Sequence, residues 1–132
     1  MEHSIFLTDN KLLNLATTGN DGYPHVVPVA FMFHQGRLYI STGTKSRKVN
    51  NIRGDSHVAF AVEDSTRLKA IVGKGTARIL PLHGPQDDIM KKLVIHLVGS
   101  LEHPYAKLMM GENRVIIEII PTAMKKWESP PT

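Results

Sequence analysis

The stretch from Arg37 to Gly54, RLYISTGTKSRKVNNIRG, predicts a strand, a tight turn and a short basic helix. Its first part, Arg37–Thr42, alternates β-branched and aromatic residues in the manner of a strand. Gly43 interrupts this pattern and Thr44 is a suitable helix cap, while Gly54 is expected to end the helix in a left-handed conformation. The stretch therefore places a helix start directly after the end of a strand.

The start of this predicted helix carries many positive charges. Lys45, Arg47 and Lys48 all fall in its expected first turn. A helix start exposes unpaired N–H groups and the positive end of the dipole, so cations there are unfavourable unless an anion binds among them. The nearby hydroxyl groups that can add hydrogen bonds are those of Ser41, Thr42, Thr44 and Ser46. The stretch thus predicts a phosphate-type anion site, with a solvated basic helix end as the alternative.

Length and composition indicate a single domain spanning residues 1–132. The chain is 42% hydrophobic and 21% charged, which is ordinary for a globular protein. The absence of cysteine excludes disulfides and thiolate metal sites. We see neither a signal-peptide pattern nor an apolar run near the ~18 residues of a membrane span, so we expect a cytoplasmic protein that does not bind membranes. Between Asn10 and Gly54 the only acidic residue is Asp21, which favours an anionic ligand.

Strand patterns outnumber helix patterns, and most are joined by short turns, which predicts antiparallel pairing of about six strands. Pro28 cannot donate to a ladder, so we expect an edge, bulge or break there, with backbone groups free for a ligand. Gly73 and Gly75 predict a strong bend, as in a small barrel. The expected strands are Leu12–Thr18, Tyr23–Phe33, Arg37–Thr42, His57–Glu63, Leu68–Leu80 and Arg114–Ile120. Helices are expected at Glu2–Thr8, after Gly43, at Gly84–Leu101 and at His103–Met110.

Three segments resemble the flavin-binding split-barrel proteins related to pyridoxamine-phosphate oxidase. They are LATTGNDGYPHVVPVAF (15–31), LYISTGTKSRKVNNIRGDSHVAFAVE (38–63) and RVIIEIIPTAMKKW (114–127). The most specific parts are the hairpin exit with Gly22 and Pro24, and the Ser46-Arg47-Lys48 helix start. The resemblance implies a mainly β fold with α insertions, a six-stranded antiparallel split β-barrel. It also implies a homodimer with FMN bound at the subunit interface.

The resemblance also assigns binding roles to particular residues. Arg47 and Lys48 would pair with the phosphate of FMN. The residues that would assist them are Thr42, Lys45, Ser46 and, as a brace for the loop, Asn51. The residues that would contact the flavin ring are Val27, Pro28 and Val29 on one strand, Ile40 and Ser41 on the next, and Arg67 and Leu68 from the partner subunit.

By the same alignment, the true vitamin B6 oxidases carry an arginine in place of Val27 and a lysine in place of Met32. We therefore expect a different activity, namely hydride transfer between a reduced flavin and a small organic acceptor. The alternatives are a deazaflavin-dependent reductase and a non-catalytic carrier of flavin or haem. No residue stands out as catalytic. His25 lies near the expected ring position and has either a structural or a functional role.

Other kinds of partner are disfavoured by the sequence. No histidine pair has the spacing of a zinc site, so we expect no protein-bound metal ion. A basic barrel that binds nucleic acid would need aromatic residues among its cations, and only Tyr39 lies near the basic stretch. We therefore expect a small-molecule substrate and no nucleic acid.

Overall fold

The computed structural model describes residues 3–66, 68–81 and 86–128. The strands are β1 (Leu12–Thr18), β2 (Pro24–Ala30), β3 (Met32–His34), β4 (Arg37–Gly43), β5 (His57–Glu63), β6 (Lys69–Pro81) and β7 (Arg114–Glu128). The helices are α1 (Ser4–Asp9), α2 (Arg47–Gly54), α3 (Gln86–Val98) and α4 (Pro104–Met109). In the part of the chain covered by these ranges, no helix is long and apolar enough to cross a membrane.

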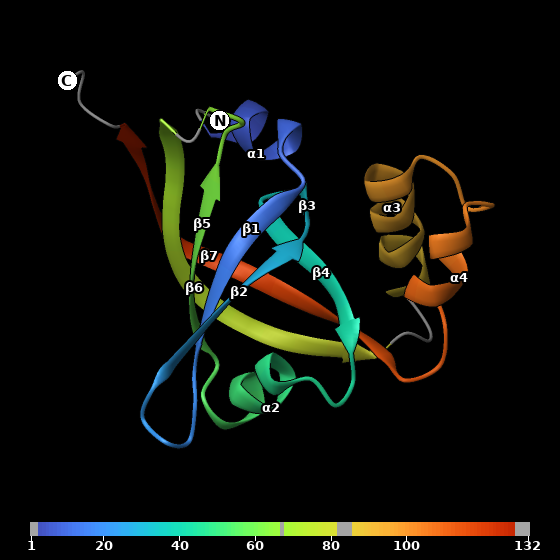
Figure 1. The fold of residues 1–132 in the computed structure, drawn as a ribbon, viewed down its shortest axis with the longest axis horizontal. Helices are drawn as coiled ribbons and strands as arrows, with labels where there is room; N and C mark the ends of the chain where they lie inside the picture. The colour runs from blue at the N-terminus through green and yellow to red at the C-terminus, as the bar shows by residue number, and fades with distance from the viewer. Residues whose placement is uncertain (1–2, 67, 82–85, 129–132) are drawn as a thin grey trace.

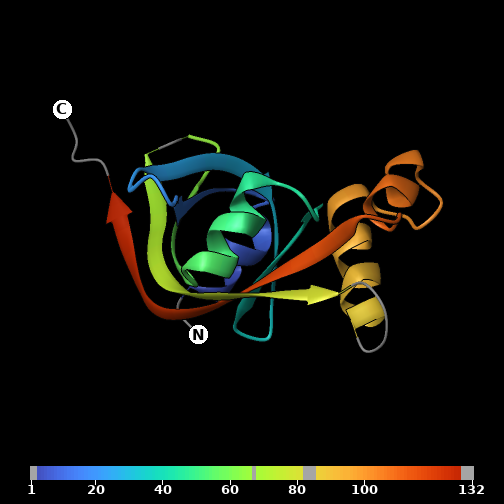
Figure 2. The same ribbon diagram turned by 90° about the horizontal axis from the view of Figure 1, so that it is seen from below.

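All neighbouring strands pair antiparallel, in the order β2-β1-β5-β6-β7-β4-β3. The sheet curls into a split barrel, with α1 and α2 at opposite ends and α3 and α4 beside its outer surface (Figures 1 and 2). This confirms the predicted fold. The described residues form seven strands and not six, because the predicted strand Tyr23–Phe33 divides at Phe31. Pro28 remains in register opposite Asn14, on the edge strand β2, so the edge alternative is the correct one.

Strand β6 is strongly curved, as predicted (Figure 1), and Gly73 and Gly75 lie where a side chain has no room. A Cβ atom on Gly73 would collide with the Phe60 ring, and one on Gly75 would collide with the carbonyl oxygen of Ile120. The register with β7 shifts between Lys74 and Gly75. This irregularity accommodates Pro121, so β7 continues to Glu128 and does not end at Ile120 as predicted.

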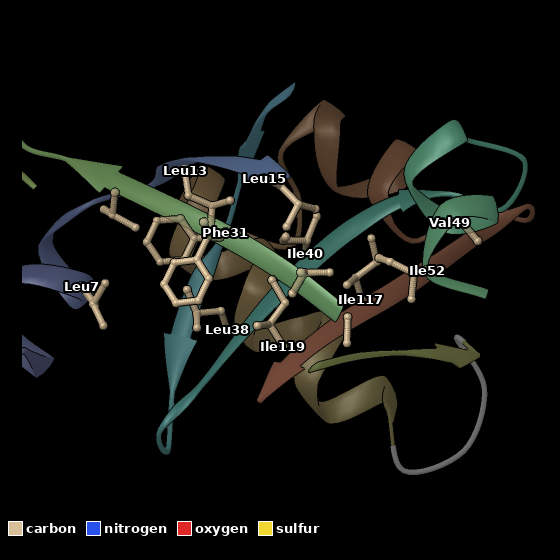
Figure 3. Packing of buried hydrophobic residues seen from close by; sticks show 14 of the residues in the cluster. Leu7, Leu13, Leu15, Phe31, Leu38, Ile40, Val49, Ile52, Ile117 and Ile119 are labelled. Atoms are coloured by element: carbon tan, nitrogen blue, oxygen red, sulfur yellow. The ribbon is translucent and has the colours of Figure 1, made fainter. Parts of the chain in front are cut away.

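Two hydrophobic clusters lie on opposite faces of the curled sheet. The first fills the barrel (Figure 3) and includes Leu13, Leu15, Ile40, Ile117 and Ile119, with Val49 and Ile52 added from α2. The second lies outside and joins α3 and α4 to the sheet through Met32, Tyr39, Met90, Leu93, Val94, Ala106, Met109 and Ile116. Because side chains alternate along a strand, β4 presents Ile40 to the barrel and Ser41 to the outer surface near α4.

Candidate functional site

Helix α2 begins later than the sequence predicts. Its N-cap is Ser46 and its first helical residue is Arg47, so the expected cap at Thr44 is wrong. Lys45 precedes the helix and is exposed. Gly54 is the last helical residue and lacks the expected left-handed φ, because the chain leaves the helix in an extended conformation at the next residue. No acidic side chain lies in the first turn, so the basic character of the helix start is retained.

Asn51 holds α2 against the barrel. Its Nδ2 atom donates a hydrogen bond of 3.0 Å to Oγ1 of Thr17 on β1. Both residues are buried, with exposed fractions of 5% and 2%. Val49 and Ile52 of the same helix pack into the barrel core. These contacts and the Asn51 hydrogen bond together hold the helix start in place on the barrel.

Two strand edges lie unpaired above this helix. Strand β2 is an edge of the sheet, and β3 pairs only with the Arg37–Tyr39 part of β4. The residues expected to contact a ring, Val27–Val29 on β2 and Ile40 and Ser41 on β4, therefore lie on edges that no other described strand pairs. Figure 1 shows β2 and β4 on either side of the split, with α2 below them. Unpaired N–H and C=O groups at such edges are available to a ligand.

At the end of β4 a second arginine joins the site. Arg114 opens β7 and pairs with Gly43. Its Nη2 atom donates a 3.1 Å hydrogen bond to Oγ of Ser41, which in turn donates to the carbonyl oxygen of Met109 at 3.3 Å. Burial lowers the pKa of Arg114. Burial also lowers the pKa of Lys48, and the charge of Arg114 lowers it further. We call Ser41, Lys48 and Arg114 the Lys48–Arg114 cluster.

This cluster has no counter-charge within the described ranges. The ion pairs there involve Arg37, His57, Arg78 and Lys92, and neither Lys48 nor Arg114 is among them. Both side chains are half-buried. The cluster is therefore a concentration of positive charge at the point where the free edge of β4 meets the start of α2.

Arg47 lies in different surroundings. Together with Asn51 it lines a hollow of about 440 Å³ beneath the β1–β2 turn, whose other lining residues are Gly19, Asn20, Asp21, Tyr23, Pro24 and His25. The Nδ1 atom of His25 is buried and has no hydrogen-bond partner among the described residues. Consecutive helical side chains point about 100° apart. Arg47 thus faces the hollow beneath the β1–β2 turn, whereas Lys48 lies beside Arg114, although both belong to the same helix start.

Of the remaining residues predicted to bind the cofactor, some lie near the start of α2 and others lie far from it. Thr42 is buried, and its Oγ1 donates a long hydrogen bond of 3.5 Å to Oγ of Ser46. Leu68 is 57% exposed in the β5–β6 turn, which lies at the end of the barrel away from α2 (Figure 1). Arg67 lies outside the described residues. Leu68 therefore cannot join the site within one chain, and its expected role requires a second copy.

Sequence reasoning missed Arg114 as a site residue, although one signal was available. If the last strand had been paired antiparallel with Arg37–Thr42, its first residue would have fallen opposite the end of that strand, beside the basic stretch. The described residues contain no cluster of at least three His, Cys, Asp or Glu side chains.

Comparisons with known proteins identify the family of the chain. The family model described as pyridoxamine 5'-phosphate oxidase matches residues 2–128. A reductase of 5a,11a-dehydrotetracycline and 5a,11a-dehydrooxytetracycline from Streptomyces rimosus is 40% identical over 79 residues, which cover 53% of this chain and 56% of that enzyme. The chain thus matches about half the length of this relative.

Two solved structures share most of the chain. One, described as an F420 reductase, is 29% identical, with a TM-score of 0.74 over 92% of this chain and 94% of that chain. The other, a conserved hypothetical protein from Mycobacterium tuberculosis, is 25% identical, with a TM-score of 0.81 over 96% of this chain and 82% of that chain.

Proposed function

Because the chain belongs to the pyridoxamine 5'-phosphate oxidase family, we propose that it is an oxidoreductase that binds a flavin or deazaflavin cofactor between β2 and β4. The observation that carries this proposal is the unpaired edge of β4 beside the Lys48–Arg114 cluster, together with the unpaired edge of β2. The cofactor exchanges hydride with a small organic acceptor.

The residues present fit such a cofactor. A flavin-type molecule has a flat ring with hydrogen-bonding atoms along one edge, and a polar chain that carries a phosphate. The edges of β2 and β4 offer free backbone groups beside the apolar side chains of Val27 and Val29. The buried Nε atom of Arg114, which has no partner among the described residues, offers a donor to an anion.

When bound, the cofactor supplies the hydride-transfer chemistry. The contribution of this chain is to hold the ring by backbone groups, to hold the anionic end by Lys48 and its neighbours, and to leave one face of the ring open to an acceptor. Backbone N–H groups can stabilise negative charge on a ring edge without a strongly basic side chain. An acid–base pair is therefore not required of this site.

Of the two cofactor classes, the comparisons give more support to a deazaflavin. The structure described as an F420 reductase aligns with more than nine-tenths of both chains at 29% identity. The Streptomyces relative is a reductase, which supports transfer of hydride from the cofactor to the acceptor. FMN remains the alternative within the same site.

We also propose a homodimer with the cofactor at the subunit interface. The outer face of β2, β1, β5 and β6 is rich in small and apolar residues. We call it the outer sheet face, and its small and apolar residues are Ala16, Val26, Ala59, Ala61 and Val72. Val26 and Val72 are 61% and 43% exposed in the single chain. An apolar face of this kind supports burial against a second copy. The position of Leu68, far from α2 in its own chain, supports a contribution from the partner.

The test is binding followed by turnover. The purified protein is titrated separately with F420 and FMN, with the fluorescence of the cofactor as the signal. The loaded protein is then supplied with a chemical or enzymatic reductant and a panel of acceptors with conjugated double bonds. We expect binding of one cofactor and oxidation of its reduced form by an acceptor. Binding without any turnover would identify a carrier, and binding of neither cofactor would refute the proposal.

A further inference from the structure

Arg114 has hydrogen-bonding capacity that the described residues do not use. An arginine has five N–H donors in a planar fork. One of its terminal nitrogens, Nη2, donates to Ser41 at 3.1 Å, but its Nε atom is buried and has no partner within the described ranges. An unsatisfied buried donor is destabilising, so its retention points to a ligand that accepts from it.

The charges around Arg114 point in the same direction. Lys48 lies close enough for the two positive charges to repel, and burial acts on both. By contrast, the chain neutralises two other arginines of the sheet, because Arg37 and Arg78 both pair with Glu118, at 3.2 and 2.6 Å. The Lys48–Arg114 cluster is therefore a place where the fold concentrates positive charge and leaves the neutralising anion to come from outside.

Ser41 fixes the orientation of the arginine. Its Oγ accepts a hydrogen bond from Arg114 and donates one to the carbonyl oxygen of Met109 in α4. The serine hydroxyl is thereby held between two elements, which leaves the remaining edge of the guanidinium fork to the ligand. A fork beside an ammonium group suits a tetrahedral oxyanion, which accepts two parallel bonds from arginine and a third from lysine.

We propose that Arg114, positioned by Ser41, binds the phosphoryl group of the cofactor jointly with Lys48. Arg47, which lines the hollow on the other side of the helix start, contributes less. The identity of the phosphoryl compound rests on the proposed function, whereas the presence of an oxyanion site does not.

The first test compares cofactor affinity in Arg114→Gln, Lys48→Gln and a control, Arg53→Gln. Arg53 is exposed at the far end of the same helix, so its replacement removes an equal charge. We expect F420 or FMN to bind about 10–100-fold more weakly to the two cluster variants, the range for a charge-assisted hydrogen bond. Riboflavin, which lacks phosphate, should bind all four proteins equally. Unchanged F420 and FMN affinity in Arg114→Gln would overturn the proposal.

A milder substitution keeps the test informative if Arg114→Gln fails to fold. Ser41→Ala leaves both cations in place and removes only the group that orients Arg114. It should weaken F420 or FMN binding several-fold and riboflavin binding less, because only F420 and FMN carry the phosphate that Arg114 would hold. If Ser41→Ala binds the phosphate-bearing cofactor as tightly as the wild type does, the positioning role is refuted.

The second test uses inorganic phosphate alone, at constant ionic strength. Phosphate should raise the melting temperature of the wild-type protein, because a ligand of the folded state stabilises it. The rise should be lost in Arg114→Gln and retained in Arg53→Gln. If the wild type binds neither F420 nor FMN but shows this pattern, the proposed function fails and the oxyanion site stands. If phosphate stabilises no variant, or all equally, the oxyanion site is refuted.

Discussion

The hydroxyl of Tyr39 on β4 donates a hydrogen bond of 3.0 Å to the carboxylate of Glu118 on β7. The same carboxylate accepts from Nε of Arg78 at 2.6 Å and pairs with Arg37 at 3.2 Å. Glu118 is only 4% exposed. Burial by itself raises the pKa of Glu118, but the hydrogen bonds from Arg78 and Tyr39 outweigh burial and hold the pKa below its ordinary value.

Glu118 should therefore make stability depend on pH. Since its folded-state pKa lies below the unfolded one, its contribution is complete above the ordinary carboxyl pKa and is lost as the pH falls through the lowered value. We expect Glu118→Gln to reduce the free energy of unfolding at pH 7 by about 1–3 kcal/mol, because the partly exposed arginines lose their partner. Urea denaturation at pH 7 and pH 3 measures this, and the difference should shrink at pH 3.

An exposed ion pair supplies the control for Glu118. Asp88 lies 3.7 Å from Lys92 one helical turn away and is 81% exposed at its side chain. Asp88→Asn should change the free energy of unfolding by less than about 0.5 kcal/mol, as is usual for surface pairs. A Glu118→Gln protein as stable as Asp88→Asn at pH 7 would contradict the account of the buried carboxylate.

Gly75 should not tolerate a side chain. A Cβ atom there would overlap the carbonyl oxygen of Ile120 and lie 2.9 Å from Cα of Pro121, both in the backbone of the paired strand. We expect Gly75→Ala to cost at least about 2 kcal/mol, because the β6–β7 bulge must shift. Gly54→Ala is the control, since its Cβ meets nothing within 4 Å. Thermal melts that place both variants near the wild type would show that the bend does not depend on Gly75.

Most of the fold could be predicted from local sequence, because alternation, turns and the paired glycines act over short distances. The division at Phe31 could not, since a short β3 is defined only by its pairing with β4. Nor could the end of β7, because Pro121 is normally a strand breaker and is accommodated here by a bulge in β7, where Thr122 has no partner in the register with β6. These differences arise from pairings between segments that are distant in the sequence.

The candidate site shows the same limit. The basic helix start was visible in the sequence because Lys45, Arg47 and Lys48 are consecutive or nearly so. Arg114 was not, since it reaches the site only through the register of β7 against β4. The separation of Arg47 from Lys48 was also hidden, because it depends on where α2 begins. The sequence thus predicts an anionic ligand, and the fold is needed to propose which cations would bind it.

Asn51 should contribute more to the stability of the fold than its neighbour Asn50. It links α2 to β1 through the buried hydrogen bond with Thr17, whereas Asn50 is exposed. We expect Asn51→Ala to lower the free energy of unfolding by about 1–2 kcal/mol, because Thr17 loses its buried partner. Asn50→Ala should be nearly neutral. Urea denaturation of the two variants provides the comparison, and equal midpoints would refute the bracing role of Asn51.

The outer sheet face should control assembly. Val72→Lys places a charge on this face, whereas Ile95→Lys places the same charge at a similarly exposed apolar position on α3, with exposed fractions of 43% and 50%. We expect Val72→Lys to shift the protein from dimer to monomer in sedimentation velocity, because an unpaired charge would be buried in the interface. Ile95→Lys should remain dimeric. A wild-type monomer that binds cofactor would contradict the proposed dimer.

The central claim, that this barrel holds the phosphate of a flavin-type cofactor beside α2, is tested most directly by pairing one variant with two ligands. The measurement is the dissociation constant of wild type and Lys48→Ala for the phosphate-bearing cofactor, F420 or FMN, and for riboflavin, by fluorescence titration. We predict that Lys48→Ala loses about 1.5–3 kcal/mol of binding free energy for the phosphate-bearing cofactor and none for riboflavin. Equal affinities of the two proteins for the phosphate-bearing cofactor would contradict the claim.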